Sequence, residues 1–388
     1  MDGNDEKSKM IDGKENSGKG RSGCKSRKGR RWLAPWKDSL ERPVIYHCVT
    51  RVVDRRFAFE QADKEKFRTF MRMQENFTGC RVLAYCLMSN HVHLLLEVPP
   101  LAVGGLSDEE LLGRMKAVHN EVTVAEVAKR LVELRQSGRH EAVRELHASI
   151  TYRMHDLGEF MKALLQRFSR WFNMNHERTG TLWESRFKSV LVEDGTAAQT
   201  MAAYIDLNPV RAGMVADPAE YRWSSYGEAM GGGPGGNGRK ARAGLVRALM
   251  AHKGYEADAR HWAGKVSRDY RMILVEEGEE TLKEVVNESG ELEVKVVRKG
   301  LKKAVVDAEM DQLQRGQDVA MGRMLRYRVR YFTDGAVIGS RGFVDEVFRL
   351  CRDRFGGNRK SGARKLCGTG VAAAGVLWSV RDLKKGIG

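Results

Sequence analysis

Hydrophobic and polar residues alternate between residues 43 and 98 in a pattern that predicts a mixed α/β unit. Apolar, β-branched runs at 44–53, 81–87 and 91–98 are typical of strands. Between 62 and 77 the apolar residues recur at helical spacing instead, and Gly79 follows where a C-cap is expected. The order strand, helix, strand, strand is the first part of a ferredoxin-like split β-α-β fold.

The pattern is interrupted after Pro99 and Pro100, which end the third strand. Ser107 and Glu110 have the spacing of a capping box, and they open a charged helical stretch that runs to about residue 146. We interpret residues 101–155 as a helical insertion. It is either a lid or DNA-facing arm, or a solvated helical hairpin.

The unit resumes after the insertion. An apolar stripe between residues 160 and 172 predicts a helix that packs on the sheet, and residues 182–193 are expected to end in a fourth strand. Here Trp183 and Phe187 are interleaved with Arg186 and Lys188. This alternation suits a surface that stacks bases and follows phosphates, and it equally suits core aromatics with basic neighbours.

The next segment predicts a helix that carries a tyrosine. Thr196-x-x-Gln199 has the pattern of a capping box for a helix over 197–208, which Pro209 would end. Tyr204 and Asn208 are spaced i, i+4 and therefore share a face. A phenol can act as a covalent nucleophile and an amide oxygen can bind a hard cation. Alternatively, Tyr204 is a half-buried helix residue and Asn208 a C-terminal cap.

Two histidines mark the third predicted strand. Because strand side chains alternate between faces, His91 and His93 point the same way and Val92 the other. Neutral imidazole is the commonest metal ligand in proteins, so the pair suits one shared cation. Alternatively, both rings line a wet face of the sheet.

Composition points to a polyanionic partner. The 388 residues carry a formal net charge of +16, which favours nucleic acid over its rival, a membrane surface. The sequence has neither an apolar run of transmembrane length nor a signal-peptide core, so we expect a soluble, cytoplasmic protein. The six cysteines form no C-x-x-C pair, and we interpret them as reduced thiols.

The two ends of the chain differ from the central unit. Residues 1–40 are polar and basic, which predicts a disordered arm that adds either phosphate contacts or only solubility. A Gly-rich linker is expected at 229–240. Residues 241–388 have a mostly helical pattern, a short β-stretch at 291–297 and a basic-aromatic run at 326–332. We interpret them as an accessory DNA-binding region, or as a plain structural domain with a basic face.

Four segments together resemble the HUH single-tyrosine transposases, and are most similar to the REP-associated tyrosine transposases. They lie, in order, at 85–95, 180–189, 204–215 and 221–226, and the resemblance covers about residues 42–228. It implies an α+β fold with an antiparallel ferredoxin-like sheet. It also implies that His91, His93 and Asn208 hold a divalent metal, Mg²⁺ or Mn²⁺, while Tyr204 attacks DNA. Ser89 stands where relatives often have proline.

The implied activity is single-strand DNA nicking and rejoining at hairpin or palindromic repeats through a 5′-phosphotyrosine. The alternative is a repeat-binding regulator without turnover. The implied partner is DNA in the nucleoid of a bacterial cell, with no membrane, and a homodimer is also considered. The residues expected to contact DNA are Arg51, Arg55, Trp183, Arg186, Lys188 and Arg211.

Overall fold

The computed structural model describes most of the chain between Trp32 and Val380. The described residues are 32–55, 58–100, 104–231, 238–250, 258–278, 281–286, 292–298, 300–302, 304, 306–307, 332–333, 335–355, 359–366 and 376–380. Most of the predicted basic arm, the run 326–331 and two of the six cysteines, Cys24 and Cys367, lie outside them. The other four cysteines are buried, and none of them is in a disulfide.

The centre of the fold is an antiparallel sheet of four strands. These are β1 (Val44–Arg51), β2 (Arg81–Leu87), β3 (His91–Val98) and β4 (Lys188–Val192), in the order β2-β3-β1-β4. Helices α1 (Gln61–Thr78) and α5 (Leu157–Asn175) connect β1 to β2 and β3 to β4. This is the ferredoxin-like arrangement, so the predicted α+β class is confirmed.

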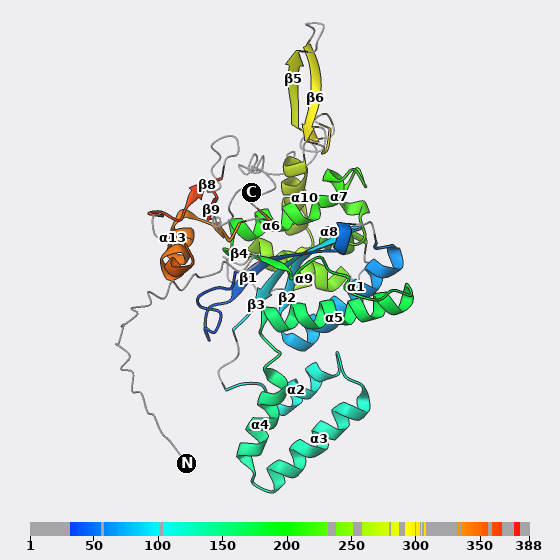
Figure 1. Cartoon of the computed structure of the whole chain (residues 1–388), viewed down its shortest axis with the longest axis vertical. Helices are drawn as coiled ribbons and strands as arrows, with labels where there is room; N and C mark the ends of the chain where they lie inside the picture. Colours follow the sequence, from blue (N-terminus) through cyan, green and yellow to red (C-terminus); the bar gives the residue numbers. More distant parts are fainter. Residues whose placement is uncertain are drawn as a thin grey trace, which may run out of the picture.

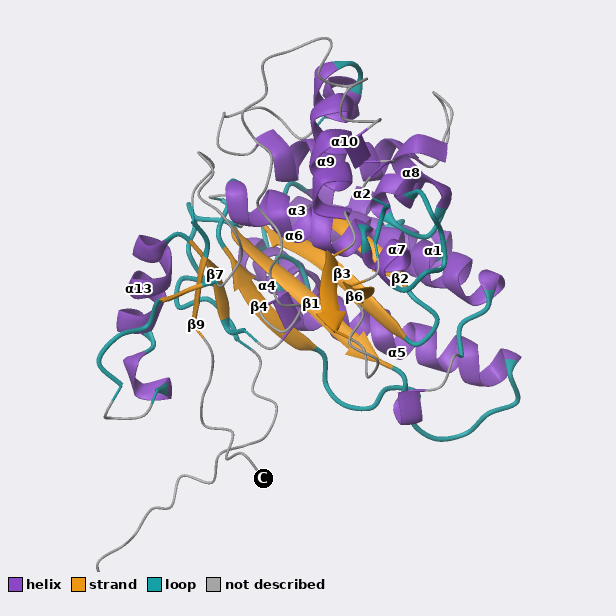
Figure 2. Cartoon of the chain, turned by 90° about the horizontal axis from the view of Figure 1, so that it is seen from above, coloured by secondary structure: helices purple, strands orange, loops and turns teal. Residues whose placement is uncertain are grey.

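The two faces of the sheet are covered by different helices (Figures 1 and 2). Helices α1 and α5 pack together on one face. The opposite face is covered by α6 (Thr196–Asp206), α8 (Ser225–Gly231) and α9 (Gly238–Met250). Gly244 lets α9 lie directly on β2, because an added Cβ there would lie 2.2 Å from the carbonyl oxygen of Val82. The face that bears His93 and Glu97 belongs to this second side, since Glu97 pairs with Arg247 of α9.

The carboxy-terminal region extends the same sheet. Strand β7 (Val337–Gly339) pairs in parallel with β4, and β9 (Trp378–Val380) and β8 (Arg364–Lys365) follow. Helix α13 (Arg341–Leu350) packs on β7 and β9. Helix α9 and strands β7 and β9 share one hydrophobic core with β1 to β4, so these parts of the accessory region 241–388 pack on the central sheet. Its role in DNA binding stays a prediction.

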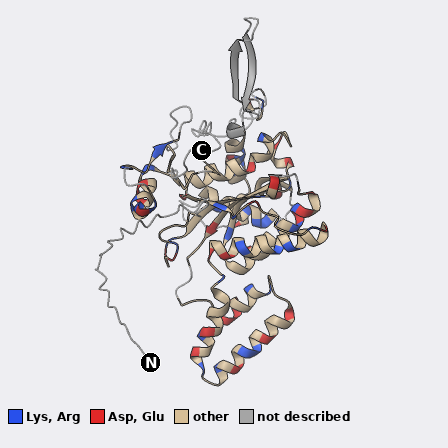
Figure 3. Ribbon diagram, viewed as in Figure 1, with Lys and Arg blue, Asp and Glu red and all other residues tan. Residues whose placement is uncertain are grey.

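Helices α2 (Asp108–Met115), α3 (Glu121–Gln136) and α4 (His140–Thr151) confirm the helical character of the insertion. They project away from the sheet (Figure 1), and the capping box at Ser107 and Glu110 is present. The insertion has small cores of its own, one of which forms around Phe77 of α1. Acidic and basic residues are interspersed along α3 and α4 (Figure 3), as on a solvated hairpin.

Three boundaries differ from the predictions. Trp32 is buried and Ala34 N–H donates to the Tyr46 hydroxyl, so the ordered chain begins before residue 40. Both ends of the predicted linker are helical, in α8 and α9. Gly195, with a φ of 78°, is the N-cap of α6, while Gln199 Nε2 donates to the Leu249 carbonyl. The predicted capping box at Thr196 is therefore wrong.

The remaining elements are short or peripheral. Helix α10 (Lys265–Gly278) packs on α6, and the hairpin of β5 (Thr281–Val286) and β6 (Leu292–Arg298) confirms the β-stretch expected near 291–297. One-turn helices are η1 (Val53–Arg55), α7 (Asn208–Arg211), η2 (Pro218–Glu220), η4 (Ala259–Trp262) and η5 (Arg352–Arg354). Within the described residues, no helix is both long and apolar enough to cross a membrane.

Candidate active site

The structure brings Tyr204 of α6 to the histidine pair of β3. The ring centroids of His91 and His93 are 4.9 Å apart, and that of Tyr204 is 5.9 Å from His93. The two elements belong to neighbouring layers, because β3 lies in the sheet and α6 packs on it. The predicted shared face of the two histidines thus points at the predicted tyrosine.

A third histidine, His47 of β1, fixes the state of His93. Its Nδ1 lies 2.8 Å from the carbonyl oxygen of Phe332, which can only accept, so this nitrogen carries the proton. In a neutral ring the other nitrogen, Nε2, is then an acceptor, and it lies 2.9 Å from His93 Nδ1. His93 therefore donates from Nδ1 and keeps an unprotonated Nε2, the form in which a histidine binds a metal.

His91 is held in the same tautomer by its neighbour in the chain. Its Nδ1 lies 2.6 Å from Asn90 Oδ1, an acceptor, which leaves Nε2 without a proton. Burial lowers the pKa of His47 and of His91 to about 4, and in His91 the charge of Arg51 lowers it further. Burial also lowers the pKa of His93 well below its usual value, followed by the effect of the two other histidines. All three rings are neutral at pH 7.

Tyr204 is covered from both sides. Its side chain is 2% exposed, and the ring of Phe332 stacks on it with centroids 4.5 Å apart and an interplanar angle of 18°. The guanidinium of Arg211 lies 5.0 Å from the centroid of the Tyr204 ring, and its Nη1 donates to the Tyr204 carbonyl oxygen. A cation over a phenol ring stabilises the phenolate form.

Asn208 lies one turn beyond Tyr204, at a break between two helices. Helix α6 ends at Asp206, and Asn208 begins α7, in whose first turn Pro209 needs no N–H partner. The predicted single helix over 197–208 is thus wrong at its end. Asn208 Nδ2 donates to the carbonyl oxygens of Tyr204 and Ile205, as a C-terminal cap does. These two hydrogen bonds fix the amide group through its nitrogen and do not involve its oxygen.

The donor set fits a divalent cation. Two unprotonated imidazole nitrogens and an amide oxygen are ordinary ligands for such an ion. His47 cannot be a ligand, because both of its nitrogens are engaged. Among the described residues, no group of three or more His, Cys, Asp or Glu side chains is placed to hold a metal. That His91, His93 and Asn208 together hold the ion stays a prediction.

The residues expected to contact DNA are five cations and one aromatic residue. Arg51, Arg186 and Lys188 are exposed, and Arg211 is half-buried beside Tyr204; the side chain of Arg55 lies outside the described part.

Trp183 is half-buried and packs against the core. Its ring packs against Phe59, Phe67 and Phe168, and its Nε1 donates to the Leu165 carbonyl. Phe187 is also buried. Phe187 therefore fits the core interpretation, whereas Trp183 is only half-buried and its contact with DNA stays a prediction.

A family model agrees with the sequence resemblance. Residues 42–129 match the family model described as "Transposase IS200 like". This part of the chain, which spans β1 to β3 and both histidines of the pair, is thus similar to IS200-like transposases, and the resemblance is confirmed there. A solved structure titled "Structure of the REP associates tyrosine transposase bound to a REP hairpin" is 12% identical, with a TM-score of 0.33, and covers 62% of this chain and 93% of that one. No curated protein matches.

The sequence reasoning missed His47 and Phe332. His47 could have been noticed as a polar residue within an apolar strand, but its bond to His93 depends on the pairing of β1 with β3. Phe332 has no comparable signal, since it is far along the chain from both groups that it contacts.

Proposed function

We propose that this chain is a DNA nicking and strand-transfer enzyme in which Tyr204 is the nucleophile. The observation that carries the proposal is the approach of the Tyr204 ring to His93 across the sheet and helix layers. The match of residues 42–129 to IS200-like transposases supports the class of reaction.

The metal would be held by His91 Nε2, His93 Nε2 and Asn208 Oδ1, and would be Mg²⁺ or Mn²⁺. When bound, such an ion supplies positive charge beside the phosphate that is attacked. His47 acts as a positioning residue for this site. By accepting the proton of His93 Nδ1 it keeps His93 Nε2 unprotonated and fixes the orientation of the ring.

The chemical step exchanges one phosphate ester for another. The phenolic oxygen of Tyr204 forms a bond to phosphorus, and the bond from phosphorus to the 3′ oxygen breaks. The phenol proton passes through water to the leaving 3′ oxygen. The products are a 5′-phosphotyrosine and a DNA 3′-hydroxyl. A 3′-hydroxyl of another strand can reverse the step and restore the free tyrosine. The Arg211 guanidinium favours this attack because it stabilises negative charge on the Tyr204 ring.

The substrate we propose is single-stranded DNA with a hairpin or palindromic repeat. The sequence blocks shared with the REP-associated transposases support this choice. The exposed cations Arg51, Arg186 and Lys188 would contact its phosphates.

The test is a covalent adduct. Wild-type protein is incubated with a 5′-labelled or 3′-labelled hairpin oligonucleotide and Mn²⁺, and then denatured. Label should stay on a peptide containing Tyr204 only when it lies 3′ of the nick. The Tyr204→Phe variant should bind the oligonucleotide as tightly and form no adduct. Tyr152→Phe, at an exposed tyrosine of the insertion, is the matched control and should behave as wild type. An adduct in the Tyr204→Phe variant would contradict the assignment.

One observation favours the second candidate function, a DNA-binding regulator without turnover. Tyr204 is covered by Phe332 and almost fully buried, so DNA reaches it only when that ring moves. A wild-type protein that binds the hairpin but forms no adduct at any metal concentration would establish this alternative.

A further inference from the structure

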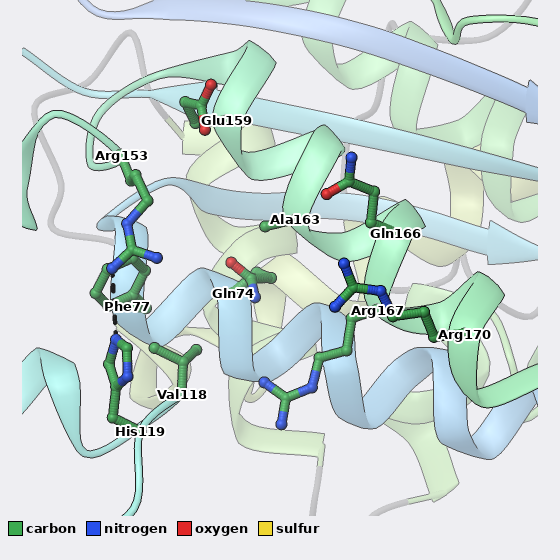
Figure 4. A pocket seen from close by; sticks show the side chains of 10 residues that line it. All are labelled: Gln74, Phe77, Val118, His119, Arg153, Glu159, Ala163, Gln166, Arg167 and Arg170. Carbon is green, nitrogen blue, oxygen red and sulfur yellow. Dashed lines mark hydrogen bonds between the residues drawn. The ribbon is translucent and has the colours of Figure 1, made fainter. Parts of the chain in front are cut away.

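A pocket of about 340 Å³ lies between the insertion and the two helices on the outer face of the sheet. Gln74 and Phe77 of α1 form its floor, α5 contributes one wall, and His119 and Arg153 of the insertion contribute another. Figure 4 shows the arginine side chains entering from two sides, Arg153 from the segment after α4 and Arg167 and Arg170 from α5. The sheet separates this pocket from the face that bears His93 and Tyr204.

The lining carries an excess of positive charge. Within the described part of the chain, none of its three arginines forms an ion pair with a carboxylate. The one acidic residue of the lining, Glu159, pairs with Lys162 at 3.1 Å. The pKa of His119 is lowered, first by burial and then by the charges of Arg153 and Arg167, so His119 adds a neutral ring. The pocket therefore presents three cations to one small volume.

Aromatic rings hold two of these cations in place. The guanidinium of Arg153 lies 4.9 Å from the centroid of the Phe77 ring, and that of Arg167 lies 5.0 Å from Phe70. Arg153 also contacts His119 Nε2, and its buried Nε has no hydrogen-bond partner. Stacking on a ring fixes a guanidinium without using its outer N–H groups. Apart from the Arg153 Nη2 that contacts His119, these groups remain able to bind an anion.

We propose that this pocket binds a phosphate group of the DNA backbone, at a second site remote from the cleavage site. The proposal rests on the proposed function in that DNA is the ligand. Planar guanidinium groups match phosphate geometry, and a pocket of this size accepts one phosphodiester with part of its sugar. Because the site includes both the insertion and α5, a bound phosphate would fix the insertion against the catalytic unit. DNA flanking the cleaved segment would thus be anchored behind the sheet.

The test uses the double variant Arg167→Gln, Arg170→Gln and a control with the same change in charge. The control is Arg130→Gln, Arg144→Gln, on the insertion, where both arginines pair with glutamates of their own helices. Affinity is measured by fluorescence anisotropy, without metal, on a hairpin oligonucleotide with long single-stranded flanks. We expect about tenfold weaker binding in the double variant, and a salt slope reduced by about one. The control should match wild type.

Single uncharged methylphosphonates placed along the flanks then locate the phosphate. At one position the substitution should weaken binding to wild type and have no further effect on the double variant. No such position, or an equal loss in the control, would overturn the proposal. A third result is that inorganic phosphate competes with DNA for the wild-type protein while no methylphosphonate in the flanks distinguishes wild type from the double variant. That result would assign the pocket to free phosphate instead. If the double variant melts early, Arg170→Gln alone, at an exposed residue, gives the same test.

These measurements need no nicking activity. They are repeated in a Tyr204→Phe background, so a failure of the proposed chemistry leaves the pocket test intact. Conversely, a protein that forms the tyrosine adduct but shows no coupled flank position retains its proposed function and loses this second site.

Discussion

At the scale of single residues, the hydrogen bonds that His47 makes with the Phe332 carbonyl and with His93 set which nitrogen of His93 carries the proton. We expect His47→Phe to weaken Mn²⁺ binding by about tenfold or more, because His93 loses the acceptor that fixes its tautomer. His47→Gln should restore most of the affinity, since its amide oxygen can accept from His93 Nδ1. Mn²⁺ electron paramagnetic resonance measures both without any DNA. Unchanged binding in His47→Phe, with wild-type thermal stability, would contradict the positioning role.

The ring of Phe332 has a separate effect from its carbonyl group. Phe332→Ala removes the stack on Tyr204 and keeps the carbonyl that accepts from His47. Since an aromatic pair contributes about 0.5–1.5 kcal/mol, we expect the adduct to form between about twofold and tenfold faster. The initial rate of adduct formation on a denaturing gel measures this. A slower rate in a variant that remains folded would show that the ring helps to place Tyr204.

At the scale of elements, the buried carboxyl of Asp206 ties α6 to two other helices. Ser225 Oγ and the Tyr226 N–H of α8 donate to Oδ1, and the Tyr270 hydroxyl of α10 donates to Oδ2. Burial raises the pKa of Asp206 to about 6, although these hydrogen bonds lower it. The folded state therefore binds more protons than the unfolded state between pH 4 and 6.

Stability due to Asp206 should consequently fall as the pH rises through this range, by on the order of 3 kcal/mol. The buried histidines, whose pKa is lowered, act in the opposite direction, so the comparison is made with Asp206→Asn. The free energy of unfolding in urea, measured for both proteins at pH 4.5 and 7, should show wild type losing stability relative to the variant. A difference that does not change with pH would refute the raised pKa.

The elements whose hydrophobic residues recur with a clear period could be predicted from the sequence. Strands β1 to β3 and helices α1 and α5 were placed within a few residues, because each has a buried face long enough to show alternation or helical spacing. Strands β7, β8 and β9 have two or three residues and no period, so their addition to β4 depends on tertiary pairing alone. The candidate site divides in the same way: His91, His93, Tyr204 and Asn208 follow from local motifs, whereas His47 requires the strand register.

At the scale of the whole molecule, residues far apart in the chain meet at one site. The Phe332 carbonyl bonds to His47 of the first strand, and the Phe332 ring stacks on Tyr204 of α6. The candidate active site therefore requires the carboxy-terminal region as well as the family-matched segment 42–129. The basic pocket between the insertion and α5 joins two further segments on the other side of the sheet.

The pairing of β7 with β4 also limits how two copies of the chain could assemble. An exposed edge strand is a template on which a second molecule can add its own strand. The backbone of β4 at Leu191 and Val192 is already paired with Val337 and Ile338. The new outer strand, β8, consists of Arg364 and Lys365, and a short, charged strand repels a copy of itself. Two copies are therefore not expected to join their sheets side by side through the β8 edge.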